Sequence, residues 1–220
     1  MSLGYNMKLD EVLKDFLSSI LAGCVIGLGG AVLLSVNVPV LNALFFSVCL
    51  LSIVQLKLKL YTGAIGFLYD GSKPTTVGTM YLGNIVGVWI FGNLLKMTHL
   101  AIPQNASKLL ESKAHMLQLL PLWDILLVGF LCGVLVHIAV GVWKTDVVKS
   151  EFAKVVITLW GITSFILCGF EHCIADAFYL CVASPNIYPI ENQVVFILLL
   201  TIGNGLGGLV SHWAFKLSKC

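Results

Sequence analysis

Six long apolar stretches dominate the pattern of hydrophobic and polar positions along this chain. A helix needs about 20 apolar residues to cross the hydrocarbon core of a bilayer, and each stretch is long enough for one crossing. The second and the fifth are longer than one crossing needs, and both contain polar interruptions. The pattern therefore predicts an all-α integral membrane fold with six transmembrane helices, near residues 18–36, 40–70, 75–98, 121–143, 152–181 and 191–215.

The composition indicates that a single membrane domain fills the chain. Hydrophobic residues make up 58% of 220 positions and charged residues 11%, whereas soluble domains carry about 25% charged residues. We expect one domain over residues 18–215, with halves near 18–98 and 121–215, a linker at 99–120 and a tail at 216–220. Since no stretch is left for a soluble catalytic module, an enzyme is not expected.

The basic residues are all lysines, and their distribution predicts an orientation in the lipid bilayer. If the N-terminus lies inside, the inner segments hold eight lysines and the outer segments hold three. Such a bias favours both termini in the cytoplasm. A net charge of +2 without arginine gives no support to nucleic-acid binding. The inner lysines are Lys8, Lys14, Lys73, Lys144, Lys149, Lys154, Lys216 and Lys219, and the outer ones are Lys96, Lys108 and Lys113.

An amphipathic segment precedes the first crossing. Apolar residues recur there at helical spacing, with charged residues between them. This pattern predicts an interfacial helix over residues 1–17 on the inner membrane surface. The alternative is that the segment is the start of the first crossing. The apolar positions are Leu9, Val12, Leu13, Phe16 and Leu17.

The two halves of the chain repeat one another in the same order. The pair Gly23 and Gly27 in the first crossing recurs as Gly129 and Gly133 in the fourth, an offset of 106 residues. Gly83-Asn84 in the third crossing recurs as Gly203-Asn204 in the sixth, an offset of 120 residues. Because each half has three crossings, the second half enters the membrane from the opposite side. The sequence therefore predicts an inverted repeat.

The repeat places two polar breaks opposite one another. Subtracting the offsets from His172 leads to residues 52–66, where Lys57 and Lys59 alternate with leucines and Gly63 and Gly66 follow. Non-helical backbone at membrane depth persists only where it is buried in protein or lines a cavity. Broken helices at matching places of inverted halves indicate a permeation site.

The second break contains three ionisable residues, Glu171, His172 and Asp176, inside an apolar span. Ionisable groups cost about 2.5–3.5 kcal/mol each at the centre of a membrane helix on insertion scales. We therefore expect them to face a pore, a partner or a ligand. The linker should lie on the outer side of the membrane, with its histidines, His99 and His115, in contact with solvent.

The residues of both breaks resemble those of the formate/nitrite transporter family. The resemblance rests on several motifs in the order of that family, and it covers nearly the whole chain. The motifs are Leu60-Tyr61-Thr62-Gly63, Gly169-Phe170-Glu171-His172, Gly83-Asn84, Gly203-Asn204 and Phe46-Ser47-Val48-Cys49-Leu50.

This resemblance implies an aquaporin-like protomer in a homopentamer of a bacterial or archaeal cell membrane, with one pore in each protomer. It implies small monovalent weak-acid anions as substrates: formate, nitrite, hydrosulfide, and in some members acetate or lactate. No cofactor or metal is expected. By position, Thr62 and His172 form the central polar pair. The residues of the apolar constrictions are Phe46, Leu50, Leu60, Tyr61 and Phe165, and Asn84 and Asn204 support the site.

Three positions depart from the family pattern. Tyr61 replaces a phenylalanine and adds a hydroxyl at a constriction. Gly133 stands where many members carry asparagine, so a polar pore contact is expected to be missing. Asp176 stands where asparagine is usual. These departures affect the expected substrate more than the expected fold.

The residue types suggest a mechanism. An apolar constriction excludes hydrated ions because their desolvation is not repaid, whereas a neutral weak acid passes more easily. Histidine has an unperturbed pKa near physiological pH, so His172 can exchange a proton with the anion. Thr62 can donate a hydrogen bond without adding charge.

The remaining polar residues receive supporting roles. We expect Glu171 to bind backbone N–H groups of the opposite break. Asp176, four residues after His172, should hydrogen-bond the imidazole, or else turn toward Asn84 or Asn204. Lys57 and Lys59 either attract anions or pack at the cytoplasmic face. His137, in the fourth crossing, is expected to be structural.

Three other functions remain open from the sequence. A proton-coupled carrier of small monocarboxylates with alternating access fits the inverted repeat as well as a channel does. A membrane cytochrome would use His137 and His172 as haem ligands, although the chain has no haem motif. A membrane enzyme would use Glu171 and His172, but it lacks a nucleophile or a cluster of metal ligands.

Overall fold

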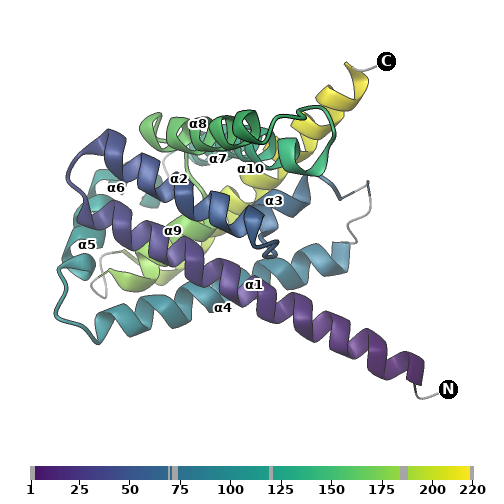
Figure 1. Cartoon of the computed structure of the whole chain (residues 1–220). Coiled ribbons are helices and arrows are strands. Elements are labelled where there is room, and N and C mark those ends of the chain that lie inside the picture. The colour runs from purple at the N-terminus through teal and green to yellow at the C-terminus, as the bar shows by residue number, and fades with distance from the viewer. Residues whose placement is uncertain (1–2, 69, 71–73, 119–120, 184–187, 219–220) are drawn as a thin grey trace.

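The computed structural model of the protein describes residues 3–68, 70, 74–118, 121–183 and 188–218. Within them every regular element is a helix (Figure 1). In these residues four helices are long and apolar enough to cross a membrane, namely α1, α4, α7 and α10. The elements are α1 (Leu3–Ser35), α2 (Pro39–Gln55), α3 (Tyr61–Ile65), α4 (Pro74–Lys96), α5 (Ile102–Ser112), α6 (Ala114–Leu117), α7 (Leu122–Lys144), α8 (Glu151–Leu167), α9 (Cys173–Val182) and α10 (Ile190–Leu217).

The helices form two groups that follow the predicted halves of the chain. Helix α1 packs against α2 and α4, α7 packs against α8 and α10, and α2 meets α8 between the groups. The second crossing is divided into α2 and α3, and the fifth into α8 and α9. The prediction of six crossings with broken second and fifth helices is confirmed, and the chain is a multi-pass membrane protein.

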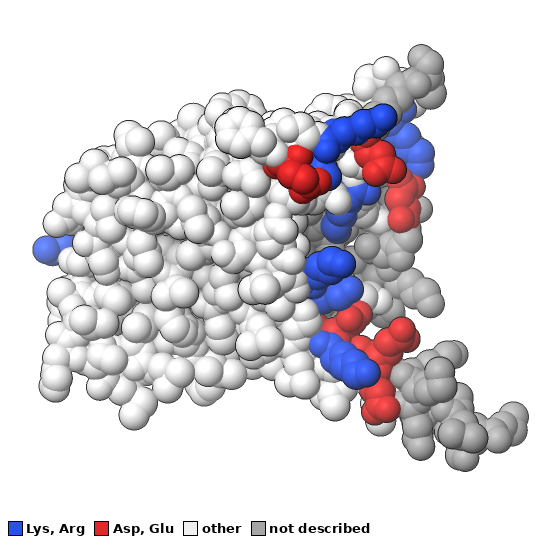
Figure 2. Space-filling view, in the orientation of Figure 1, with Lys and Arg blue, Asp and Glu red and all other residues white. Residues whose placement is uncertain are grey.

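The surface has the character of a protein in a bilayer. Both termini lie at the same end of the molecule (Figure 1), and most charged side chains of the face shown in Figure 2 gather at that end. A broad uncharged band covers most of the rest of this face, and a basic side chain is visible at the opposite edge. Large apolar side chains such as Leu82, Trp89 and Leu198 are exposed. Lipid tails can cover such a surface, because helices satisfy their backbone groups internally.

The inverted repeat is confirmed, with one correction to its register. A Cβ atom on Gly23 would lie 2.2 Å from the carbonyl oxygen of Asn84, and one on Gly133 would lie 2.2 Å from that of Asn204. Gly23 therefore corresponds to Gly133, 110 residues later. Pairing Gly23 with Gly129 is wrong by one helical turn, because glycines four residues apart in both helices allow either alignment. The offset of 120 residues between the two asparagines is confirmed.

The N-terminal segment and the first crossing form one helix. Helix α1 runs from Leu3 to Ser35 without interruption, and Leu9 and Leu13 on it are exposed. The interfacial position of residues 1–17 stays a prediction, and the unbroken helix supports the alternative in which this segment is the start of the first crossing. Two lysines of the predicted inner segments, Lys73 and Lys219, lie outside the described residues.

The linker between the halves folds into α5 and α6. His99 is exposed and the His115 side chain is 58% exposed, so the predicted contact of both histidines with solvent is confirmed. Lys113, which joins the two helices, behaves differently. It is only 9% exposed, although it was predicted to belong to an outer segment.

Candidate functional site

Two asparagines hold the two breaks in the same way. The residues before α3 and α9, Leu60 and His172, are extended, with φ of −111° and −107°. The Oδ1 atom of Asn84 accepts a hydrogen bond from the backbone N–H of Tyr61, and that of Asn204 accepts one from Cys173, each at 2.9 Å. Each amide satisfies a backbone donor at the start of a short helix that has no partner within that helix.

The Nδ2 group of each asparagine donates hydrogen bonds to backbone carbonyl oxygens, one of which belongs to the break itself. Asn84 Nδ2 donates to the carbonyl oxygens of Lys59 (2.9 Å) and Ser19 (2.8 Å). Asn204 Nδ2 donates to those of Glu171 (2.9 Å) and Gly129 (2.8 Å). Each break is thereby tied to the long helix beside it, and the supporting role predicted for the asparagines acquires a specific geometry.

The breaks bring Thr62 and His172 together in the interior. Thr62 Oγ1 lies 2.9 Å from His172 Nε2, and the two residues are 2% and 3% exposed. His172 Nδ1 accepts a hydrogen bond from the backbone N–H of Ala175 at 3.3 Å. An accepting Nδ1 carries no proton, so the hydrogen bonds assign the proton to Nε2, which donates to Thr62. In this arrangement the imidazole is neutral.

A cavity of about 330 Å³ adjoins the pair on the side of α5 and α6. We call it the carboxylate cavity, because Glu171 and Asp176 line it together with His172 and Lys113. Phe46 and Phe165 also line it, and their ring centroids are 6.3 Å apart. The Phe165 ring stacks on His172 with centroids 6.0 Å apart. Two aromatic rings thus lie beside the polar pair, where an apolar constriction is expected.

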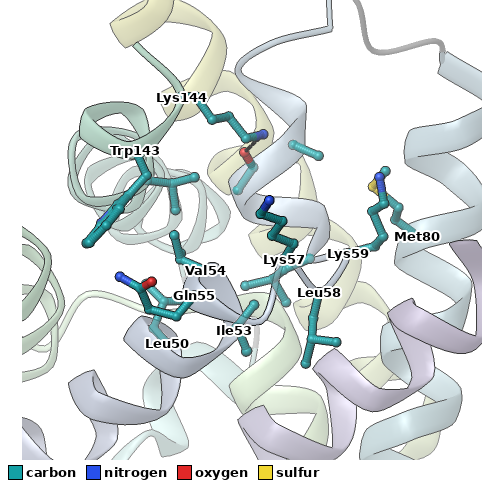
Figure 3. Close-up of a pocket in the computed structure, with 14 residues that line it drawn as sticks. Leu50, Ile53, Val54, Gln55, Lys57, Leu58, Lys59, Met80, Trp143 and Lys144 are labelled. Carbon is teal, nitrogen blue, oxygen red and sulfur yellow. Dashed lines mark hydrogen bonds between the residues drawn. The ribbon is translucent and has the colours of Figure 1, made fainter. Parts of the chain in front are cut away.

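A second cavity, of about 390 Å³, adjoins the site on the side of the chain termini. We call it the lysine cavity, because Lys57, Lys59 and Lys144 line it (Figure 3). Leu50 and Leu60 also line it and are 2% and 5% exposed. Both are apolar residues of the expected constrictions.

The sequence profile of the formate/nitrite transporter family matches residues 5–217. The chain belongs to this family. It is 25% identical over 226 residues to the nitrite transporter NirC of Salmonella typhimurium, covering 93% of this chain and 82% of that protein. It is 29% identical over 135 residues to the uncharacterized transporter YwcJ of Bacillus subtilis, covering 59% of this chain and 52% of that protein.

Solved structures of the formate/nitrite transporter family share the fold. An FNT family ion channel superposes with a TM-score of 0.80 at 21% identity, covering 97% of this chain and 93% of that chain. A pentameric formate channel with formate bound superposes with a TM-score of 0.80 at 22% identity, covering 96% and 99%. The predicted architecture is therefore that of the family.

Within this family member, the carboxylate cavity contains an ion cluster that the sequence did not reveal. Lys113 Nζ lies 2.5 Å from Glu171 Oε2 and 2.6 Å from Asp176 Oδ1. Burial alone lowers the pKa of the Lys113 ammonium, but the Asp176 and Glu171 carboxylates outweigh burial and raise the pKa above its ordinary value. Lys113 therefore stays charged. The only sequence signal for its buried place is the helical character of the linker around it.

Two predicted roles are corrected by this cluster. The Glu171 side chain binds Lys113 rather than backbone N–H groups of the opposite break. Asp176 also binds Lys113 and not the imidazole, whose ring nitrogens are engaged by Thr62 and Ala175. Neither carboxylate role was predictable, because the lysine that pairs with both lies about 60 residues away in the chain.

The other departures from the family pattern also find a place. The Tyr61 hydroxyl donates to the carbonyl oxygen of Thr201 at 3.1 Å, and Tyr61 lines neither of the two cavities. Its hydroxyl is therefore directed to α10, and the place of Tyr61 at a constriction stays a prediction. Gly133 packs against the backbone of Asn204, which leaves no space for an asparagine side chain there.

Lys144 is a residue of the lysine cavity that sequence reasoning missed. It counted only as one of the inner lysines, because it ends the fourth apolar stretch. In the structure its Nζ donates to the carbonyl oxygen of Gly63 at 2.9 Å (Figure 3) and lies 4.4 Å from the ring centroid of Phe67. Lys144 therefore contacts the helix that carries Thr62.

His137 packs as an apolar residue would. Its ring lies 5.0 Å from that of Phe67 and 5.5 Å from that of His212, between centroids. A Cβ on Gly66 would meet its ring at 2.3 Å. The repeat exchanges the two partners of this contact. Gly27 occupies the position that corresponds to His137, and it packs against Phe178, which occupies the position that corresponds to Gly66. The prediction of a structural role for His137 stays a prediction, and this packing supports it.

Proposed function

We propose that the protein is a pore for small monovalent weak-acid anions, with formate, nitrite and hydrosulfide as candidates. One observation carries the proposal: a buried polar pair, Thr62 and His172, lies between two cavities and beside apolar side chains. The names of the similar nitrite transporter and of the formate channel support this class of substrate. The alternative within transport is a proton-coupled carrier of small monocarboxylates.

The pair would bind a substrate through neutral donors. The His172 Nε2–H and the Thr62 hydroxyl can both donate to an oxygen or sulfur atom of the anion. Before His172 can give a proton through Nε2, a second proton has to reach Nδ1, and the hydrogen bond from Ala175 has to open. We therefore propose that His172 acts first as a hydrogen-bond donor, and that proton exchange on the ring follows only after this rearrangement.

The apolar side chains would set the selectivity for the protonated form. Phe46, Phe165, Leu50 and Leu60 offer no replacement for the hydration shell of an ion, so an ion passes slowly where a neutral acid does not. The haem alternative loses support. Each ring nitrogen of His172 makes a hydrogen bond, and a nitrogen that coordinated iron would have to give up its own bond.

We further propose a homopentamer in a bacterial or archaeal cell membrane with both termini in the cytoplasm. The pentameric relative in the structural comparison and the bacterial sources of the similar proteins support the assembly and the location. The excess of lysines on the side of the termini supports the orientation. Cross-linking of the protein in membranes, with a ladder that ends at five subunits, is the result expected.

Anion flux into liposomes tests the proposed function. Flux of formate, nitrite and hydrosulfide is compared between the wild type and His172→Ala, with His99→Ala as a control on an exposed linker histidine. Loss of a hydrogen bond to a charged group costs about 1.5–3 kcal/mol, so His172→Ala should reduce flux by about 10- to 100-fold. Normal flux with unchanged pH dependence in His172→Ala would contradict the proposal. Saturation and acceleration by a proton gradient would favour the carrier.

A further inference from the structure

The charges in the carboxylate cavity do not balance. One ammonium group, on Lys113, is within 2.6 Å of carboxylate oxygens from both Glu171 and Asp176. If both acids are ionised, the cluster has one net negative charge. The three side chains are only 11%, 8% and 1% exposed, in the order given. A buried charge without a partner is costly, and such a group normally takes up a proton instead.

One carboxylate oxygen of the cluster is visibly unsatisfied. Asp176 Oδ2 is buried and has no hydrogen-bond partner among the described residues, whereas Asp176 Oδ1 binds Lys113. An ionised carboxylate accepts hydrogen bonds at both oxygens. Asp176 also lines the carboxylate cavity, next to His172. The unsatisfied oxygen thus belongs to the group that a substrate in this cavity would meet.

The neighbouring titratable groups do not supply the missing positive charge. His172 is neutral in its hydrogen-bonded form, and His115, which also lines the cavity, faces its own carboxylate, Asp124, at 3.6 Å. The other titratable groups around the cluster are thiols and phenols, which carry no charge when protonated. They are Cys132 on α7 and Cys173 and Tyr179 on α9.

A metal ion is a poor candidate for the missing charge. Among the described residues, no group of three or more histidine, cysteine, aspartate or glutamate side chains is arranged to hold one. Hard cations require several oxygen ligands, and the rest of the lining includes Leu33, Phe46, Met116 and Phe165. A proton needs only one oxygen atom.

We propose that Glu171 and Asp176 retain one proton between them at neutral pH and deliver it to the anion in the carboxylate cavity. This inference rests on the proposed function. In the transfer, the O–H bond of the carboxylic acid breaks and an O–H or S–H bond forms on the anion, which gives a neutral weak acid and a carboxylate. A hydronium ion from the adjoining solution then restores the carboxylic acid and releases water.

The assignment gives Asp176 a role that asparagine cannot fill. An asparagine at this position would leave Lys113 paired with Glu171 alone, with the charges balanced and no proton to retain. The neutral His172 then acts on the newly formed acid as a hydrogen-bond donor, without having to be protonated at Nδ1. The carboxyl pair and the imidazole thus divide two tasks that the sequence had assigned to His172.

Infrared spectroscopy of the purified protein in lipid tests the retained proton without any substrate. The wild type should show the C=O stretch of a protonated carboxyl group at neutral pH, with a shift in deuterium oxide. Asp176→Asn and Glu171→Gln should both lose this band, because either change balances the charge of Lys113. Asp146→Asn, at an exposed carboxylate, should keep it. A wild type without the band, or variants that both keep it, would overturn the proposal.

Flux then tests the delivery of the proton. In Asp176→Asn, the pH at which anion flux is half-maximal should shift by about one unit or more relative to the wild type, while Asp146→Asn should not shift it. If Asp176→Asn loses the infrared band but keeps the wild-type pH profile, the proton is not delivered and the proposal fails. That result would leave the proposed function standing, since the function itself is judged by the flux of the wild type and of His172→Ala.

Discussion

The two cavities beside the Thr62–His172 pair have the same backbone plan but differently charged side chains. In both, an asparagine of a long helix holds the start of a short helix, with a 2.9 Å bond from Tyr61 or Cys173. The lysine cavity has three lysines, and Lys59 is 3.7 Å from a partly exposed Asp15. The carboxylate cavity has one lysine between two buried acids.

This difference shows that the inverted repeat preserves the hydrogen bonds that the backbone of each break requires, while the charged side chains of the two halves differ. The asparagines satisfy donors and acceptors that any broken helix at membrane depth exposes. The charges, by contrast, depend on what each cavity contacts. Anions would meet attractive potential in the lysine cavity and a proton donor in the carboxylate cavity. The repeat thus supplies a symmetric scaffold for an asymmetric path.

The largest effect should come from removing Lys113. Lys113→Met leaves two buried carboxylates with one proton and no cation, and breaking a buried ion pair on one side costs about 3–5 kcal/mol. The matched change in the lysine cavity, Lys59→Met, breaks a pair with side chains 41% and 35% exposed and should cost about 0–1 kcal/mol. Unfolding of both variants in detergent micelles measures the difference. Equal losses would mean that the two cavities are not electrostatically distinct.

The two asparagines should give large and similar effects. Asn84→Ala and Asn204→Ala each remove one accepted and two donated hydrogen bonds in the interior. Unsatisfied buried groups cost about 1–3 kcal/mol each, so either variant should lose several kcal/mol of unfolding free energy. Thermal unfolding followed by size-exclusion chromatography compares them, with the half-buried Asn93 changed to alanine as control. A large loss in one variant alone would contradict the symmetric scaffold.

The smallest expected effect on stability depends on pH and comes from Asp70, near the chain termini. The Lys216 and His212 side chains donate hydrogen bonds to Asp70, at 2.8 and 2.7 Å, and these bonds lower the pKa of the Asp70 carboxyl below its ordinary value of 3.8. Because the folded pKa is depressed, the contribution to stability is present above pH 3.8 and is lost as the pH falls through the folded pKa.

Thermal unfolding of Asp70→Asn across this pH range measures that contribution. The variant should be less stable than the wild type at neutral pH, and the two should converge in acid. Asp146→Asn serves as the control at an exposed carboxylate of the same end of the molecule. A constant difference between Asp70→Asn and the wild type at every pH would show that the ion pair is not the cause.

Much of the fold follows from local properties of the sequence. The length of each apolar stretch predicted a crossing, and the polar residues inside the second and fifth stretches predicted the breaks at Lys57 and His172. The repeat of Gly83-Asn84 as Gly203-Asn204 predicted which long helices support the breaks. The register of the first and fourth crossings was wrong by one turn, because small residues four apart fit a neighbouring helix in two ways. Only the contact of Gly23 and Gly133 with the asparagine carbonyls distinguishes them.

The sequence by itself determined which residues stand at the breaks, because a polar run in an apolar span needs a pore or a partner whatever surrounds it. It did not determine how the charged ones pair. Lys113 reaches Glu171 and Asp176 from a linker helix, across 58 and 63 residues of chain. Such a pairing depends on how α5 and α6 pack over α9, and no local pattern records that packing. The tertiary structure alone decided that Asp176 faces a lysine and not the histidine one turn before it.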